Sequence, residues 1–563
     1  MLQLAKRYAC LFDPLEQLKP FQEMTDALRK PGVFSVYGPD DAQRAHLIAG
    51  VMRSMMRPAV VVVPNEMAAQ RMTEDLGLLL DGRARNLPAR DISFLKTAAS
   101  SRELTMRRIE ALGDCATGQA VALVVSADAM MNRLMPVGRF REHVIEIDEA
   151  MRMEPADLMA KLTAAGYERV QLVEARGQCA LRGGILDVYP VGAPNALRIE
   201  FFDDEIDSIR SFDVMTQRSI SRRESVRLYP ASETILDGDE ALKAAQLLSY
   251  LLKSSTRGKA DNRQRKIEAE FNLMPFEDFL KMTEEDDEPA ERAPGTGRRT
   301  MPLKGIERNF SAAVDALETG RSFDGEDSLI PVLMNYADLP MDYLNDPIVV
   351  LDQPERLRDR CENRFLEFKE QFSAALEREE ALPVQAELLL QYETVLARMD
   401  GRSVLIANPF MRTEKDFRPQ ALFKIECRNA TGYQGNIKEL ARDLKGWKEE
   451  GWRVALLAGG TARGERLEKA LEGQAFRADF MESMPEALQP GEPVILPITL
   501  NRGFLYPEIR LAIVSESDIY GVNRQKSHAR ARSGEKIAAF TELRVGDYVV
   551  HENHGIGQYM GTV

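Results

Sequence analysis

One loop of the sequence stands where a nucleotide-binding protein would hold phosphate. Residues 33–37 predict a strand, and an amphipathic helix is expected from about residue 42 to residue 56. A triphosphate loop between them would read Gly-x-x-x-x-Gly-Lys-Ser/Thr, with the lysine on the β and γ phosphates and the hydroxyl on magnesium. This chain has Gly38-Pro39-Asp40-Asp41-Ala42-Gln43-Arg44-Ala45. Both groups are missing and two aspartates would repel a triphosphate, so we predict a degenerate loop (Gly38, Asp40, Asp41, Arg44) without a cofactor.

Three further patterns resemble a phosphate loop, a zinc site and a set of paired cysteines, but their spacing does not fit these sites. Gly459 and Gly460 follow a predicted strand, but no lysine comes after them, which favours a simple strand-to-helix turn. His551 and His554 are three residues apart, whereas a zinc-protease helix spaces them by four, so a turn is favoured. The five cysteines are scattered without paired spacing, which predicts reduced, structural thiols. We therefore predict no catalytic residue and no metal site.

Length and composition limit the class of protein. A chain of 563 residues predicts about three to five domains, and 44% apolar with 29% charged residues is typical of soluble globular proteins. No apolar run approaches the roughly 18 residues of a membrane span, so we expect a cytoplasmic protein with no membrane contact. The net charge of −14 argues against a protein that wraps nucleic acid over its whole surface, and makes protein partners the default.

The elements that must position these residues follow an α/β order. Strands at 33–37, 60–63 and 121–125 alternate with helices, which predicts a parallel sheet. Residues 85–120 are expected to form a short connection, a helix and a loop. Further helices are expected at residues 66–80, 101–112, 154–165, 243–253, 262–271, 362–380 and 437–447.

Residues 178–213 predict strands and tight turns. The strand at 185–189 runs into Pro190, and residues 199–202 lead into an acidic turn at 203–205, from which the chain returns. This pattern predicts a small antiparallel sheet. Its charged face would carry Arg182, Asp187, Arg198 and Arg210.

The exact residues of this stretch are more informative than its pattern of apolar and polar positions. Arg-Gly-Gly-Ile-Leu-Asp-Val-Tyr-Pro (182–190), Phe-Phe-Asp-Asp-Glu-Ile-Asp-Ser-Ile-Arg (201–210) and Phe-Asp-x-x-Thr-Gln-Arg-Ser (212–219) closely resemble a domain shared by the excision-repair protein UvrB and the transcription-repair coupling factors. In both families this domain docks onto UvrA.

The resemblance also implies which residues contact UvrA. Matched to UvrB, two contact arginines fall on Arg169 and Arg182, where they would pair bidentately with partner carboxylates. A third falls on Ala180, and Arg176 is the candidate substitute for it. The alternative is that these arginines only solvate a sheet face.

Other segments distinguish the two families. UvrB keeps a working phosphate loop and a tyrosine-rich hairpin that inspects damaged DNA, but residues 85–120 here contain no tyrosine. Residues 543–559 predict the first hairpin of a small β-barrel and resemble the start of the Tudor-like, RNA polymerase-interacting domain of the coupling factors, which UvrB lacks. Residues 503–521 resemble the end of their small third domain. The sequence is identified as similar to the amino-terminal part of a transcription-repair coupling factor.

The resemblance predicts an α/β multidomain protein. A degenerate P-loop, RecA-like parallel α/β domain would carry an inserted small α+β UvrA-docking domain. A second small α/β domain and the start of a Tudor-like β-barrel would follow. The expected boundaries are 1–127 and 215–355 for the two parts of the UvrB-like domain, 128–214 for the insertion, 356–400 for a linking helix, 401–521 for the small α/β domain, 522–540 for a basic linker and 541–563 for the truncated RNA polymerase-interacting domain.

By this likeness the complete protein takes part in transcription-coupled nucleotide excision repair. It would be an ATP-dependent, helicase-like translocase on double-stranded DNA that displaces RNA polymerase stalled at lesions and recruits UvrA. This segment would be the non-catalytic recruiting part, with ATP and Mg expected only in translocase domains beyond residue 563. A carboxy-terminal domain shuts the docking domain in the family, so we expect this segment to bind UvrA constitutively.

Two rival functions remain. An active UvrB-like, ATP-dependent enzyme that binds damaged DNA would need the phosphate lysine and the hairpin, and both are missing. ATP hydrolysis that is abolished by changing Asp40 or Arg44 would favour it. A structural scaffold without UvrA contact is the third hypothesis.

Overall fold

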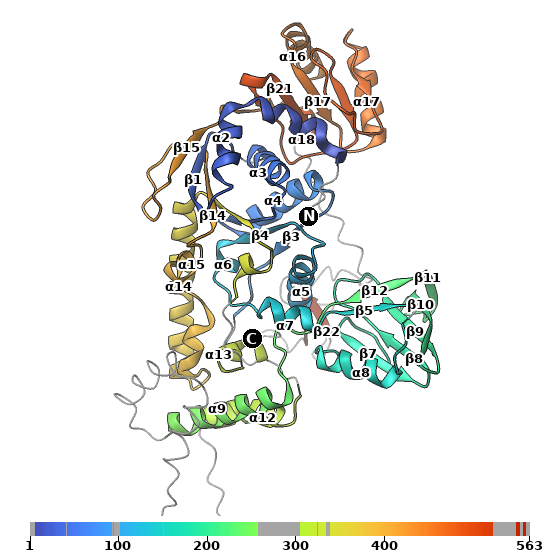
Figure 1. Cartoon of the computed structure of the whole chain (residues 1–563), viewed down its shortest axis with the longest axis vertical. Helices are drawn as coiled ribbons and strands as arrows, with labels where there is room; N and C mark the ends of the chain where they lie inside the picture. Colours follow the sequence, from blue (N-terminus) through green and yellow to red (C-terminus); the bar gives the residue numbers. More distant parts are fainter. Residues whose placement is uncertain are drawn as a thin grey trace, which may run out of the picture. The chain divides into compact units, whose positions relative to one another are not determined.

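The computed structural model describes residues 6–40, 42–92, 94, 102–149, 151–256, 305–321, 323, 325–333, 338–521, 548–551 and 555–558. The chain forms two compact units, Met1–Tyr520 and Gly521–Val563. Figure 1 shows the elements of the first unit, where two sheets and an inserted domain are built from separate parts of the chain.

A seven-stranded parallel sheet forms the centre of the first unit. Its order is β15-β1-β14-β13-β2-β4-β3. Every residue of β2, β4, β13 and β14 is buried, as expected for parallel strands covered on both faces. The strands are β1 (Gly32–Tyr37), β2 (Ala59–Val63), β3 (Ala84–Leu87), β4 (Ala122–Ser126), β13 (Ile348–Asp352), β14 (Ser403–Asn408) and β15 (Ala421–Lys424).

Two predictions about this sheet were wrong in detail. The edge strand β3 lies where a mere connection was expected, because its four residues include the polar Arg85 and Asn86 and give no strand signal. The predicted second domain began at residue 401, but β14 and β15 flank β1 in the first sheet. An apolar run identifies a strand without identifying the sheet that it joins.

Helices cover the sheet and extend from it. The predicted helices at 42–56, 66–80, 101–112, 243–253 and 362–380 are present, whereas 262–271 lies outside the described residues. They are α3 (Ala42–Met55), α4 (Glu66–Leu79), α5 (Arg102–Ala116), α9 (Gly238–Thr256) and α14 (Pro354–Glu377). The other helices of these parts of the chain are η1 (Lys6–Tyr8), α1 (Ala9–Phe12), η2 (Asp13–Gln17), α2 (Lys19–Ala27), α6 (Ala127–Met130), α7 (Val137–Glu142), α12 (Gly305–Glu318), η3 (Glu326–Leu329), α13 (Ile330–Leu333), η4 (Pro340–Asp342), η5 (Pro383–Leu388) and α15 (Tyr392–Ala397).

The inserted domain is a six-stranded sheet with one helix on its inner face. Its order is β11-β10-β9-β8-β7-β6, and only the β6–β7 pair is parallel. Helix α8 (Pro155–Ala164) buries Leu158 and Leu162 in the same core as Leu186 and Ile199 of the sheet. The strands are β6 (Glu168–Arg169), β7 (Gln178–Arg182), β8 (Ile185–Val188), β9 (Ala196–Phe202), β10 (Glu205–Phe212) and β11 (Ser219–Arg223).

The inserted domain ends later than predicted. Strand β12 (Ser225–Leu228) pairs with β5 (Ile145–Asp148), and β11 pairs with β10, so the sheet strands continue past residue 214. All five residues of β11 are exposed. A strand without a buried side has no apolar alternation, so no pattern in the sequence predicted β11.

A second mixed sheet completes the first unit, in the order β16-β20-β21-β17-β19-β18. The predicted helix at 437–447 is present as α16 (Ile437–Glu449), and the glycine pair forms the turn between β17 and α17. The elements are β16 (Arg428–Asn429), β17 (Arg453–Leu457), α17 (Thr461–Glu472), β18 (Asp479–Phe480), β19 (Val494–Leu496), β20 (Phe504–Tyr506), η6 (Pro507–Ile509), β21 (Leu511–Ser515) and α18 (Glu516–Tyr520).

The second unit is described only as a hairpin. Strands β22 (Tyr548–His551) and β23 (Gly555–Gln558) pair antiparallel, with His551 opposite Gly555. The predicted hairpin is therefore present, and the barrel that it would begin stays a prediction. The basic linker expected at 522–540 lies outside the described residues.

A buried histidine joins three parts of the first unit. The His46 ring, on α3, stacks on Phe12 with the ring centroids 5.0 Å apart. Its Nε2 lies 2.9 Å from the carbonyl oxygen of Leu11, and its Nδ1 lies 3.3 Å from the hydroxyl of Tyr506 in the second sheet. Burial lowers the pKa of His46 from 6.5 to about 4, against the smaller opposite effect of the Leu11 carbonyl. The imidazole is therefore neutral near pH 7.

We expect His46 to make the first unit acid-sensitive. Below pH 6.5 the His46 imidazole is protonated in the unfolded chain but stays neutral in the folded chain. The free energy of unfolding therefore falls as the pH drops from 6.5 towards 4, by about 3 kcal/mol in total. Urea unfolding followed by the fluorescence of Trp447 and Trp452 should show a smaller loss between pH 7 and pH 5 for His46→Gln than for the wild type. An identical pH dependence in both proteins would contradict this assignment.

Candidate partner-binding face of the inserted domain

The outer face of the inserted sheet carries a row of polar residues in register. Asp187 of β8 is opposite Arg198 of β9, which is opposite Arg210 of β10, which is opposite Arg222 of β11. Residues on either side of this row alternate into the core beneath, where Leu186 and Ile199 pack with α8. The predicted charged face is therefore present, on the side of the sheet away from α8.

Asp187, at one end of this row, binds two arginines. Its side chain is 1% exposed, and its carboxylate accepts hydrogen bonds from Arg198 Nε at 2.7 Å, Arg198 Nη2 at 2.9 Å and Arg182 Nη2 at 2.7 Å. The hydrogen bonds to Asp187 raise the pKa of Arg198, whose guanidinium also lies 4.5 Å from the ring centroid of Phe212. Arg198 is thus held within the sheet, while the Arg182 side chain remains 49% exposed.

Apolar and cationic side chains are exposed together on this face. Phe202 is 77% exposed and Ile185 is 38% exposed, and both alternate outward from core residues of their strands. The Arg210 side chain is 44% exposed and lies 3.9 Å from Glu200. Aromatic and arginine side chains are the types enriched at protein interfaces and their hot spots. We call Arg182, Ile185, Phe202 and Arg210 the docking face.

The structure does not place Arg169 on the docking face. It is an exposed residue of the edge strand β6, opposite Cys179. The side chains of Glu168 and Gln178 are joined by a 3.1 Å hydrogen bond, so this pair shares one face of the sheet. Arg169 and Cys179 therefore alternate to the other face, that of α8. The two arginines predicted to contact UvrA lie on opposite faces of the same sheet.

The other two predicted positions offer less to a partner. Arg176 is half-buried, with its guanidinium 6.0 Å from the ring centroid of Tyr189. Ala180 is buried in a small cluster with Val173, Ala196 and Phe212. Sequence reasoning missed Phe202, although a signal existed: with Ile199 and Phe201 assigned to the core, alternation sends Phe202 outward.

A buried ion pair lies beside the loop between β1 and α3. Arg44 is 6% exposed, with Nη1 2.8 Å from Asp352 Oδ1 and Nη2 3.2 Å from Asp40 Oδ1. Burial raises the pKa of Asp352, which ends β13, while Arg44 acts in the opposite direction. Gly38 has φ of +115°, and a Cβ there would lie 2.0 Å from the carbonyl oxygen of Ile425. Asp41 lies outside the described residues.

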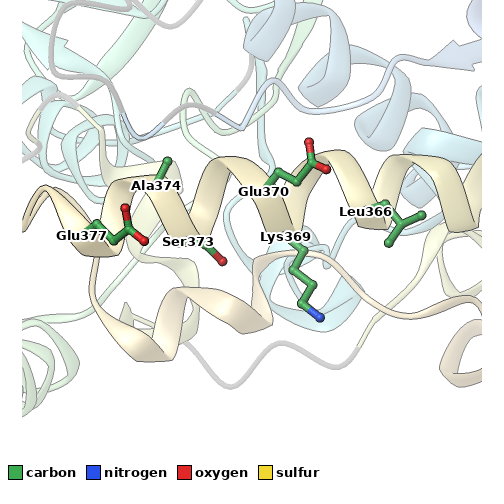
Figure 2. A pocket seen from close by; sticks show the side chains of 6 residues that line it. All are labelled: Leu366, Lys369, Glu370, Ser373, Ala374 and Glu377. Carbon is green, nitrogen blue, oxygen red and sulfur yellow. The ribbon is translucent and has the colours of Figure 1, made fainter.

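Three other kinds of feature in the described residues bear on a candidate site: metal-type clusters, long apolar helices and pockets. No group of three or more His, Cys, Asp or Glu side chains is placed there to hold a metal ion, and none of the helices described has the length and apolarity of a membrane span. A shallow hollow is lined by one face of α14, as Figure 2 shows. Its lining residues are Leu366, Lys369, Glu370, Ser373, Ala374 and Glu377. Residues from a single helix cannot enclose a substrate.

Comparison with known proteins agrees with this architecture. Residues 145–233 match the UvrB interaction domain, and residues 543–563 match the CarD-like/TRCF RID domain. The chain is 27% identical over 532 residues to the transcription-repair-coupling factor of Bacillus subtilis, covering 93% of this chain and 41% of the relative. The match is to the amino-terminal part of transcription-repair-coupling factors.

Other relatives give the same result. The transcription-repair-coupling factor of Staphylococcus epidermidis is 24% identical, with 96% of this chain and 43% of the relative covered. That of Myxococcus xanthus is 26% identical, with 96% and 44% covered. The chain therefore spans about two fifths of the length of the curated transcription-repair-coupling factors that it matches.

The matched ranges follow the elements of the structure. The UvrB interaction domain match runs from the first residue of β5 to Glu233, and so includes β11 and β12. The docking face lies wholly inside it. The second match contains the β22–β23 hairpin.

Proposed function

We propose that this chain is the recruiting segment of a transcription-repair coupling factor and that its docking face binds UvrA. The observation that supports the proposal is that the UvrB interaction domain match covers a folded unit, and that the outer face of this unit exposes Phe202, Ile185 and Arg182. Apolar anchors beside arginines suit a partner surface with an apolar pocket and carboxylates. Arg169 would add a second contact at the β6 edge.

The complete protein would couple this recruitment to transcription. We propose that it is an ATP-driven translocase on double-stranded DNA that displaces stalled RNA polymerase, and that the domain begun near residue 541 contacts the polymerase. The match at 543–563 supports the polymerase contact. We further infer that the β22–β23 hairpin begins a Tudor-like barrel and that the seven-stranded sheet belongs to a RecA-like domain.

Calorimetric titration of UvrA with this chain tests the recruiting role. We expect a saturable complex, tighter than that of the full-length protein, in which a carboxy-terminal domain would cover the docking face. The absence of heat and of co-elution with UvrA would favour the scaffold hypothesis. Equal affinity of segment and full-length protein would refute the expected masking.

Nucleotide should leave this segment unaffected. A ligand at 100 times its Kd would stabilise the fold by about 2.7 kcal/mol, but the Arg44 and Asp352 ion pair occupies the loop where phosphate would bind. We therefore expect millimolar Mg-ATP to leave the melting temperature unchanged and no ATP to be hydrolysed. A rise in melting temperature with Mg-ATP that is absent in the Arg44→Ala variant would favour the hypothesis of a UvrB-like enzyme.

A further inference from the structure

The inserted domain returns to the main sheet through a segment that packs on helix α5. The Tyr229 hydroxyl donates to Asp114 Oδ1 at 2.7 Å, and the Tyr229 carbonyl accepts a 2.8 Å hydrogen bond from Tyr167 of the inserted domain. The ring lies so close to α5 that a Cβ on Gly113 would be 2.6 Å from it. One tyrosine thus links the inserted domain to α5.

Four residues further on, Glu233 binds two buried arginines. Its Oε1 accepts from Arg108 Nε at 2.6 Å, and its Oε2 accepts from Arg108 Nη2 at 3.0 Å and Arg90 Nη2 at 2.5 Å. Arg108 belongs to α5 and Arg90 follows β3. The three side chains are 1% to 6% exposed. We call Glu233, Arg90 and Arg108 the clasp.

Backbone contacts fix the far ends of the clasp. Arg108 Nη1 donates to the carbonyl of Pro88 at 2.5 Å, and the backbone N–H of Arg90 donates to Asn132 Oδ1 at 2.8 Å. The arginines are therefore attached to the main sheet's own loops. A buried carboxylate with two such partners has few alternative geometries, because any displacement leaves a buried charge uncompensated.

Helix α5 also supports the base of the inserted sheet. Gly177 approaches Met106 and Gly192 approaches Glu110, where an added Cβ would lie 3.2 Å and 2.9 Å from those side chains. Arg102 lies 3.6 Å from Glu168. The apolar core is continuous across this joint, since Ile109 of α5 and Leu186 of β8 belong to one cluster.

We propose that Glu233 is a positioning residue, which through Arg90 and Arg108 holds the inserted domain on α5 in one orientation. The docking face is then presented in a fixed direction relative to the seven-stranded sheet. This inference goes beyond UvrA recruitment, because it concerns the free chain and holds whatever partner the face binds.

Spin-label distances between the two parts test the proposal on the whole chain without UvrA. Labels would be placed at the exposed positions Lys161→Cys on α8 and Gln70→Cys on α4, in a Cys427→Ser background, since the other four native cysteines are buried. Double electron–electron resonance should give one narrow distance distribution for the parent. Glu233→Gln should broaden it or add a second distance.

Two further variants make the result specific. Arg90→Lys keeps the buried charge balance while losing the planar fork, so we expect this variant to fold and to broaden the distribution. Glu200→Gln removes a carboxylate from the outer face and should leave the distribution unchanged. Distributions in folded Glu233→Gln and Arg90→Lys that match the parent would overturn the proposal, as would a broad distribution in the parent itself.

Discussion

Replacing Arg169 and Arg182 together by alanine should abolish a micromolar complex between this chain and UvrA. Truncating one partner of a buried charge pair at an interface costs about 2 to 5 kcal/mol. A micromolar Kd corresponds to about 8 kcal/mol of binding free energy. After two such losses, the remaining affinity would be too weak for calorimetry to detect. Titration of UvrA with the double variant and the wild type measures the effect.

The structure indicates that this double variant will fold. Without Arg182, the Asp187 carboxylate keeps both hydrogen bonds from Arg198, so no buried charge is left alone. Arg169 is exposed on a two-residue edge strand. Arg198→Ala would be a poor choice, because it removes the main partner of Asp187 and the cation over Phe212. Arg227→Ala is the matched control, since it loses only a surface ion pair with Glu146.

Single variants locate the site. Arg182 and Arg169 lie on opposite faces of the sheet. If Arg182→Ala and Arg169→Ala each weaken the binding of UvrA, UvrA must therefore extend around the β6 edge. If Arg182→Ala and Phe202→Ala weaken the binding of UvrA and Arg169→Ala does not, the binding site is confined to the docking face. Undiminished binding by the double variant, with Arg227→Ala also unaffected, would move the site away from both positions.

The sequence predicted features that local patterns encode. Alternation along 185–212 predicted a sheet with Asp187 and Arg198 on one charged face, as the strand register shows. Partners distant in sequence gave no such signal. The Glu233 contacts span 125 and 143 positions, and neither arginine belongs to a motif. Strand β15 likewise pairs with β1 although the two are distant in sequence, with Phe34 opposite Ala421.

The same difference separates the candidate site from its support. Strand periodicity predicted the places of Arg182 and Arg210 in the docking face, because they belong to strands of one short stretch, but the exposure of Ile185 and Phe202 was not predicted. The direction in which the face points depends on α5, Tyr229 and the clasp, which come from three separate segments. Charged residues in such segments are normally exposed, so composition alone would have placed Arg90, Arg108 and Glu233 on the surface.

Breaking the clasp should be the most destabilising single change in the inserted domain's attachment. Glu233→Gln removes the carboxylate that pairs directly with the buried, cationic Arg90 and Arg108, and removing one member of a buried ion pair costs about 3 to 5 kcal/mol. Urea unfolding at pH 7 measures the loss. Glu240→Gln, which loses a half-exposed ion pair with Arg139, is the control and should cost less than about 1 kcal/mol.

The pH dependence of this loss tests its electrostatic origin. Burial alone would raise the pKa of Glu233, but Arg108 and Arg90 outweigh it and lower the pKa from 4.5 to about 2. The carboxylate therefore stabilises the fold fully above pH 4.5, and its contribution declines as the pH falls from 4.5 towards 2. The stability difference between wild type and Glu233→Gln should be constant from pH 7 to pH 6 and begin to shrink between pH 5 and pH 4. A difference that stays constant down to pH 4, or one below about 1 kcal/mol at pH 7, would show that side-chain packing rather than the ion pair holds this joint.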